Sequence, residues 1–341
     1  PRGLAWSRGH VYVAEAGRGG TDCPAGMTGP SGGPLCFGRT GSLAMLHDGV
    51  ATAVLTGLIS ESDIPGGLAA EGIAAVAAAE RGGLRVLFGE SVAGFAAGLT
   101  DGATLTDENT VALTSQLGML KKVEGSSTTV LSNVGDADFT WTALHKNLVP
   151  TQFPDSNPNA LAIVGDMTYV VDAGANTLVT VDRYGTVMER AFFPNPPAAD
   201  AVPTCIAVGP DHNLYIGQLA PGAALNTGNV YRYEIASRTF SVWKTGFNVV
   251  DGCGFDKHGN FYAVEFQANG FNPGPTGNPA GDIVKITPNG TRSVLGAGKL
   301  FFPQGFAMDP AGNIYVSNWS IMTGTPAGPG APTGQVVRVT Q

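Results

Sequence analysis

A β-hairpin pattern that recurs six times constrains this chain more than any other feature. Its clearest copy runs from Pro303 to Asn318, PQGFAMDPAGNIYVSN, where two alternating apolar segments flank a Pro-Ala-Gly-Asn turn. Alternation on both sides of a Gly/Asn turn is typical of a β-hairpin. Equivalent pairs of segments begin at Gly3, Gly72, Ala160, Cys205 and Cys253. Since one such unit cannot bury its apolar faces alone, we expect the copies to pack against one another.

Most copies carry a second hairpin, with turns such as Asp48-Gly49, Tyr184-Gly185 and Asn289-Gly290. Two hairpins form a four-stranded antiparallel blade, and six blades around an axis form a β-propeller, a single all-β domain. The predicted blades cover approximately residues 1–58, 70–134, 157–194, 203–247, 250–300 and 303–341. The last copy stops after the segment Gln335–Thr340, which predicts a blade of three strands unless residues upstream of Pro1 complete it. Its free edge is either solvated or available to pair with another chain.

The composition agrees with an all-β fold. The chain of 341 residues has 49 glycines and only 13% charged residues, which fits short strands joined by tight turns and argues against helices. A net charge of −8 argues against nucleic acid as a partner. No apolar run approaches the ~20 residues that span a bilayer. Because the sequence starts at Pro1 without a signal peptide, we expect that an N-terminal segment was removed or is not included.

The four cysteines form two pairs in the sequence. Cys23 and Cys36 bracket a loop rich in Gly, Pro and Ser, which predicts a disulfide and an oxidising compartment, extracellular or periplasmic. Two free thiols in a cytosolic protein are the alternative. Cys205 and Cys253 occupy nearly equivalent places in neighbouring copies. Their offset of one residue favours two buried thiols over a bond.

The repeat register predicts two sets of polar residues around the top of the central channel. One set ends the second strand of each blade: Glu15, Glu90, Asp172, Gln218, Glu265 and Asn318. The other set precedes the first strands: Arg2, Glu71, Asn159, Thr204, Asp251 and Gln304. We expect these residues, apart from Thr204, to bind a ligand at the channel mouth.

Crowded carboxylates repel one another unless a cation or an arginine offsets their charge. Ca²⁺ takes six to eight oxygen ligands, so it is the expected cofactor if a metal is present. Its candidate ligands are Glu15, Asp172, Asp251 and Glu265. A solvated mouth without a specific ligand, and ligand recognition without metal, remain open.

Catalytic signals are few. The segment Gly29–Gly33 matches G-x-S-x-G, but it lacks the strand and helix that a nucleophile elbow needs, so we interpret the match as chance. Four of the five histidines fall in or beside short bottom-face turns. A histidine base at the mouth would have to be His145, or a carboxylate would take that role. Trp141 and Trp319, in top-face segments, are the tryptophans that could contact a ligand.

Two hairpins, PQGFAMDPAGNIYVSN and VDGCGFDKHGNFYAVE, resemble NHL-type propeller repeats. The first blade, GLAWSRGHVYVAEAGRGG, with the Cys-bracketed loop and CFGRTGSLAML after it, resembles the secreted ScyD/ScyE family. The resemblance covers nearly the whole chain and implies an exported propeller. Related six-bladed propellers include Ca²⁺-dependent lactonases and strictosidine-synthase-like proteins, whose metal ligands are acids and amides at the channel mouth. The residues that resemble those ligands in kind are Glu15, Asn159, Asp172, Asp251, Glu265 and Asn318.

Three functions follow as hypotheses. The first is a secreted, non-catalytic propeller that binds a small molecule, protein or cell-surface partner through its top face. The second is a Ca²⁺-dependent lactonase or hydrolase with its site in the central channel. The third is an extracellular structural protein that self-assembles through the edge of blade six.

Overall fold

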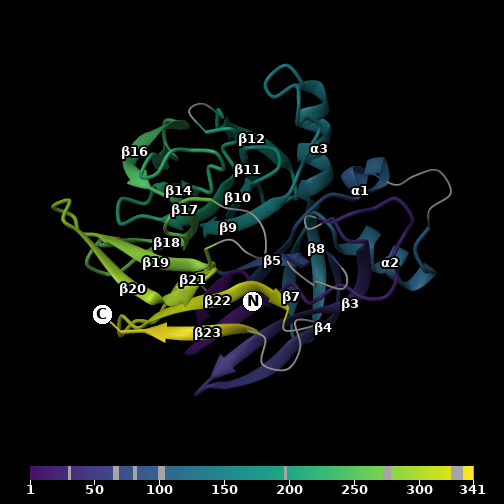
Figure 1. Cartoon of the computed structure of the whole chain (residues 1–341), viewed down its shortest axis with the longest axis horizontal. Helices are drawn as coiled ribbons and strands as arrows, with labels where there is room; N and C mark the ends of the chain where they lie inside the picture. The colour runs from purple at the N-terminus through teal and green to yellow at the C-terminus, as the bar shows by residue number, and fades with distance from the viewer. Residues whose placement is uncertain are drawn as a thin grey trace.

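The strands of the computed structural model form six antiparallel blades that follow one another around a ring (Figure 1). The structure describes residues 1–29, 32–63, 69–79, 83–98, 104–195, 198–271, 278–323 and 333–340. Within these ranges, the first five blades have four strands each and the sixth has three. The prediction of an all-β, six-bladed propeller with a shorter last blade is confirmed.

The first three blades contain β1 to β12. Blade one consists of β1 (Leu4–Ser7), β2 (His10–Glu15), β3 (Leu35–His47) and β4 (Val50–Asp63). Blade two consists of β5 (Glu71–Ala78), β6 (Leu84–Phe88), β7 (Met119–Glu124) and β8 (Ser127–Asn133). Blade three consists of β9 (Pro158–Val164), β10 (Met167–Asp172), β11 (Thr177–Val181) and β12 (Val187–Phe192).

The remaining blades contain β13 to β23. Blade four consists of β13 (Pro203–Val208), β14 (Leu214–Gln218), β15 (Gly228–Glu234) and β16 (Thr239–Phe247). Blade five consists of β17 (Val249–Phe255), β18 (Phe261–Gln267), β19 (Ala280–Ile286) and β20 (Arg292–Phe301). Blade six consists of β21 (Phe306–Met308), β22 (Ile314–Thr323) and β23 (Thr333–Val339).

An aspartate at the start of the hairpin turn fixes the innermost strand pair of blade five. The Asp256 carboxylate accepts the backbone N–H of Asn260 at 2.9 Å and its side-chain amide at 2.7 Å. The hydroxyl of Tyr262 donates to the same carboxylate at 3.0 Å. Blade six repeats this arrangement in its own turn, between β21 and β22. The aspartate, asparagine and tyrosine that recur at the same spacing in these two hairpins therefore stabilise the turn.

The apolar core lies between neighbouring blades. Between blades two and three, for example, Leu87 and Leu120 pack against Val170 and Val179, and all four are fully buried. Blades six and one close the ring in the same way, with Ala307 packed among Leu4 and its neighbours. Each blade thus buries its faces only because another blade stands beside it.

Blades one and two also share one continuous sheet. The end of β4 extends beyond its hairpin and pairs with the start of β5, so that Ser60 faces Gly72 and Glu61 faces Glu71. The sequence indicated a loop here. The extended pairing instead fixes Glu61 directly beside the channel-side end of blade two.

Three helices lie in the connections that follow β6 and β8, although the composition argued against helices. They are α1 (Val92–Gly98), α2 (Asp107–Gln116) and α3 (Val134–Leu144). Capping explains where α2 and α3 begin, because Thr106 and Asn133 each accept a backbone N–H from the first turn. Figure 1 shows all three helices beside the first three blades.

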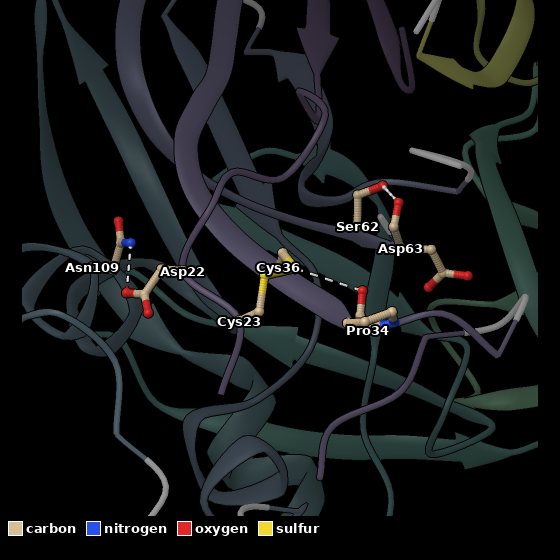
Figure 2. Close-up of a disulfide and its surroundings, with 7 residues drawn as sticks. All are labelled: Asp22, Cys23, Pro34, Cys36, Ser62, Asp63 and Asn109. Atoms are coloured by element: carbon tan, nitrogen blue, oxygen red, sulfur yellow. Dashed lines mark hydrogen bonds between the residues drawn. A yellow bond between two sulfur atoms is a disulfide. The ribbon is translucent and has the colours of Figure 1, made fainter. Parts of the chain in front are cut away.

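The disulfide between Cys23 and Cys36 is present, as predicted. Figure 2 shows it beside Asp22, whose carboxylate accepts a hydrogen bond from the amide of Asn109 at 2.9 Å. That carboxylate also accepts the backbone N–H of Thr106 at 2.7 Å. The disulfide loop is therefore tied to the start of α2.

The interpretation of Cys205 and Cys253 as free thiols is wrong, because they form a second disulfide. Their Cα atoms are 5.8 Å apart on β13 and β17. The missing side chain of Gly217 leaves room for the bond, since a Cβ there would lie 2.8 Å from the Cys205 sulfur. The two cysteines are offset by one residue in the repeat, which is about 3.3 Å along a strand, and a disulfide bond can span this offset.

The outer edge of β23 has no partner strand among the described residues. Within the same residues, no helix is both long and apolar enough to cross a bilayer.

Candidate functional site

The residues at the starts of the six innermost strands meet around the propeller axis. The guanidinium of Arg2 forms an ion pair with Glu71 and donates to Gln304 at 3.4 Å. The Gln304 amide donates to Asp251 at 2.7 Å. On the other side of the axis, the amide of Asn159 donates to the Thr204 carbonyl at 2.9 Å. The register argument thus brings together residues that are up to 302 positions apart.

These contacts largely close the top of the axial channel. The cavity along the axis measures about 80 Å³, which is room for a few waters rather than for an organic ligand. Its polar lining comes from Arg2, Asn159, Thr204, Asp251 and Gln304. Burial raises the pKa of Asp251 to about 7, although its hydrogen bond from Gln304 opposes the change.

Several residues that end the second strands make hydrogen bonds to the backbone. Three of them anchor the chain segment that enters their own blade. Asp172 accepts the backbone N–H of Asn157 at 2.7 Å, Glu265 accepts that of Asn248 at 2.9 Å, and Asn318 accepts that of Phe301 at 2.7 Å. All three are at least 97% buried, so their oxygens satisfy backbone donors that would otherwise be unpaired.

Glu15 and Gln218, which also end second strands, have separate surroundings. Glu15 accepts a hydrogen bond from the hydroxyl of Ser42. Gln218 is buried, and among the described residues its side-chain oxygen has no partner. The four candidate calcium ligands occupy separate hydrogen-bond environments: Glu15, Asp172, Asp251 and Glu265. Among the residues that the structure describes, no group of three acidic, histidine or cysteine side chains is arranged to hold a metal ion.

A larger cavity lies off the axis, where blades one and two meet. It measures about 370 Å³, and we call it the acidic cavity because three glutamates line it. They are Glu61 from β4, Glu71 from β5 and Glu90 after β6. The sequence predicted Glu71 and Glu90 as binding residues and did not single out Glu61.

Among the described residues, one of the three glutamates has a basic partner. Glu61 and Glu71 face each other across the β4–β5 pairing, where two like charges oppose each other. Arg2 pairs with Glu71, which leaves the Glu61 carboxylate without a hydrogen-bond partner in the described structure, although the residue is 92% buried. Burial, with the charge of Glu71, raises the pKa of Glu61 to about 8.

Glu90 holds an uncommon backbone conformation at this cavity. Its φ of 61° lies in the left-handed region, which non-glycine residues adopt at an energetic cost. The backbone N–H of Glu90 donates to the Asn157 side chain at 3.2 Å, which helps to hold this conformation. Burial, and then the charges of Glu61 and Glu71, raise the pKa of Glu90 well above its usual range.

Apolar side chains form the remaining walls of the acidic cavity. Phe95 of α1 lines it and packs edge-on against Phe37 at 5.1 Å between ring centroids. Leu117 follows α2, while Met27 and Leu35 belong to the disulfide loop. The Cys23–Cys36 bond and the two helices therefore shape the cavity.

The other candidates from the sequence lie elsewhere. His145 follows α3, where its ring stacks on Trp141 at 4.1 Å, and neither residue lines the acidic cavity. Trp319 stacks on Phe301 at 4.8 Å. Ser31 of the G-x-S-x-G match lies outside the described residues.

No family model matches this sequence, and a comparison with curated proteins finds no match. Among solved structures, the fold resembles a protein of unknown function from Bacteroides thetaiotaomicron, with a TM-score of 0.53 and 12% identity over 91% of this chain and 74% of that one. A streptogramin B lyase aligns with a TM-score of 0.49 and 13% identity over 99% and 93% of the two chains. Virginiamycin B lyase from Staphylococcus aureus aligns with a TM-score of 0.47 and 12% identity over 91% and 82%. At such identities the similarity concerns the fold alone, and this chain is a β-propeller protein.

Proposed function

We propose that this protein is an exported binding propeller that takes a small molecule, or a side chain of a partner, into the acidic cavity on its top face. The single observation that carries the proposal is Glu61, a 92% buried carboxylate that lines a cavity of about 370 Å³ without a hydrogen-bond partner among the described residues. Burial penalises the ionised form of this group in the empty protein, and a ligand that contacts the carboxylate would offset that penalty.

Two further features support this proposal. A cavity with apolar walls and a few convergent polar groups is the usual form of a small-ligand site. The strained backbone of Glu90 lies in the same cavity, and strain of this kind clusters at functional sites. The two disulfides fit an extracellular or periplasmic protein. Membership of the ScyD/ScyE family, suggested by the first blade, is part of the same proposal.

A blocking substitution tests whether ligands enter this cavity. Phe95→Trp adds a larger ring to its wall, whereas Phe240→Trp makes the same change on the outer strand β16, where the ring is 36% exposed. A small-molecule library is screened by ligand-observed NMR against the whole chain with its disulfides intact. We expect binders that lose signal only with Phe95→Trp. Binders that are unaffected by this variant would place the ligand elsewhere and contradict the proposal.

A Ca²⁺-dependent lactonase is a second candidate, favoured by the raised pKa of Glu61. A carboxyl group that titrates near neutral pH suits general acid–base catalysis. Hydrolysis of aryl esters and lactones, measured with Ca²⁺ and with a chelator, tests this candidate. Activity that is lost both with the chelator and in Glu61→Gln would support it, and absence of turnover in both conditions would dismiss it.

Self-assembly is a third candidate, favoured by the unpaired edge of β23. Exposed edges pair readily with other strands. Sedimentation at increasing protein concentration tests it. A monomer at every concentration would argue that this edge stays solvated.

A further inference from the structure

The balance of charge in the acidic cavity indicates what kind of ligand it accepts. Three glutamates line it, and the Arg2 guanidinium pairs with one of them, Glu71. Glu61 and Glu90 remain, and neither carboxylate has a hydrogen-bond or ion-pair partner among the described residues. A cation would supply the missing partner, because an opposite charge nearby favours the ionised form of a carboxyl group.

The walls distinguish an organic cation from a metal ion. Phe95, Leu117, Met27 and Leu35 give the cavity apolar sides, and its volume of about 370 Å³ far exceeds that of a bare ion. A hard cation such as Ca²⁺ needs six to eight oxygen ligands at short range. The described residues provide no such group of acidic side chains.

We propose that the acidic cavity binds a primary ammonium group on an apolar or aromatic body, with the nitrogen between Glu61 and Glu90 and the body against Phe95 and Leu117. This assignment rests on the proposed function and adds the chemical class of the ligand. The ammonium donates hydrogen bonds to the Glu61 carboxylate and to the carbonyl oxygen of the Glu90 carboxyl group, and its body replaces water along the apolar walls. The ring of Phe95 also offers a π-face to a cation.

Binding is coupled to the release of a proton. The groups that face Glu61 are Glu71 with its partner Arg2, and Glu90. In the empty cavity, burial and the charge of Glu71 raise the pKa of Glu61 to about 8, so the ammonium displaces the Glu61 proton when it binds. The Glu90 carboxyl group, whose pKa is also raised well above its usual range, keeps its proton. Affinity should rise about tenfold per pH unit between about pH 6 and 7.5, since one proton is released.

Benzylamine and benzyl alcohol provide a matched pair of probes, because they share a shape and differ in charge. Titration calorimetry uses the whole oxidised chain as wild type, Glu61→Gln, Glu90→Gln and, as a control, Glu108→Gln on the exposed face of α2. We expect benzylamine to bind at least about tenfold more tightly than benzyl alcohol, and to lose at least about tenfold in Glu61→Gln but little in Glu90→Gln or in the control. Buffers of different ionisation enthalpy should report the release of about one proton.

Each other outcome overturns the assignment. Equal affinity for the two probes, with loss of both in Phe95→Trp, would show a cavity for neutral ligands and leave the proposed function standing. Binding of CaCl₂ that Glu61→Gln abolishes, without binding of benzylamine, would replace the ammonium by a metal ion. If neither probe nor CaCl₂ binds and the blocking variant changes nothing in the library screen, both proposals fail.

Discussion

Replacing Glu61 by glutamine is expected to stabilise the empty protein, and to do so more strongly as the pH rises. Burial and the charge of Glu71 raise the pKa of Glu61 from 4.5 to about 8 in the folded chain. In the unfolded chain the group is in water and has its ordinary pKa. Because the folded pKa is the higher one, the folded state binds the proton more tightly. The contribution of the Glu61 proton to the stability of the folded state is therefore complete below about pH 4.5 and is lost as the pH rises through about 8.

The size of this loss follows from the same two values. The pKa of Glu61 is about 8 in the folded chain and 4.5 in the unfolded chain. This difference of about 3.5 units corresponds to about 5 kcal/mol of stability. For a chain of 341 residues, the entropy of unfolding is about 0.7 kcal/mol/K, so 5 kcal/mol shifts Tm by about 7 °C. Glutamine has nearly the same shape and does not titrate. The Tm advantage of Glu61→Gln over wild type should therefore grow by about 7 °C between acid and alkaline pH.

Scanning calorimetry between about pH 4.5 and 9 measures this difference, with disulfides oxidised in every sample. Glu108→Gln serves as the control, since its side chain is 67% exposed on α2 and should leave the pH dependence of Tm unchanged. The same pH dependence in wild type and Glu61→Gln would refute the reasoning. It would mean that the Glu61 carboxylate has a compensating partner or reaches water.

Three other changes test separate parts of the structure. Glu90→Gly should raise stability by about 1 kcal/mol or more, because glycine adopts a positive φ without cost and a half-buried acid with a raised pKa is removed; a denaturant midpoint lower than that of wild type would contradict this. Replacing Cys23 and Cys36 by serine should cost about 3 kcal/mol, since the bond closes a loop between residues 13 positions apart, and should weaken ligand binding in the acidic cavity; unchanged affinity would show that the loop does not shape the site. Asp138→Asn should reduce the fall in Tm as the pH rises above about 4, because burial and the charge of Asp172 raise the pKa of Asp138 well above its usual range and the folded state then loses stability once the pH exceeds the unfolded-state pKa; an unchanged fall would rule out this role.

Much of the fold could be predicted because each hairpin repeats the same register. The register placed Asp251 and Gln304 at matching positions in adjacent blades, and their side chains are 2.7 Å apart. It could not show what the other set of polar residues does. Asp172 and Glu265 end their strands as predicted, but they accept backbone hydrogen bonds within their own blades.

The acidic cavity could be predicted only in part, because it is built by the segments that break the repeat. Glu61 lay in an apparent link between blades, and only the extension of β4 onto β5 makes it a cavity residue. The helices α1 and α2 are only 7 and 10 residues long, and they lie in one long connection between β6 and β7 without a clear amphipathic pattern. The Cys205–Cys253 bond was missed because it joins residues one position out of step, which Gly217 allows by leaving room for the sulfur.

The joining of β4 to β5 has a mechanical consequence for ligand entry. The other sheets of the described residues remain separate, so most blades adjoin through side chains that can slide past one another. Between blades one and two, backbone hydrogen bonds join β4 to β5, so that the two blades form one continuous sheet. A molecule that arrives at Glu61 therefore meets the paired part of this sheet, while Phe95 of α1 and Met27 of the disulfide loop also line the cavity. Amide hydrogens around Ser60 and Gly72 should accordingly exchange slowly with or without ligand, while those of α1 should become protected only when the cavity is filled.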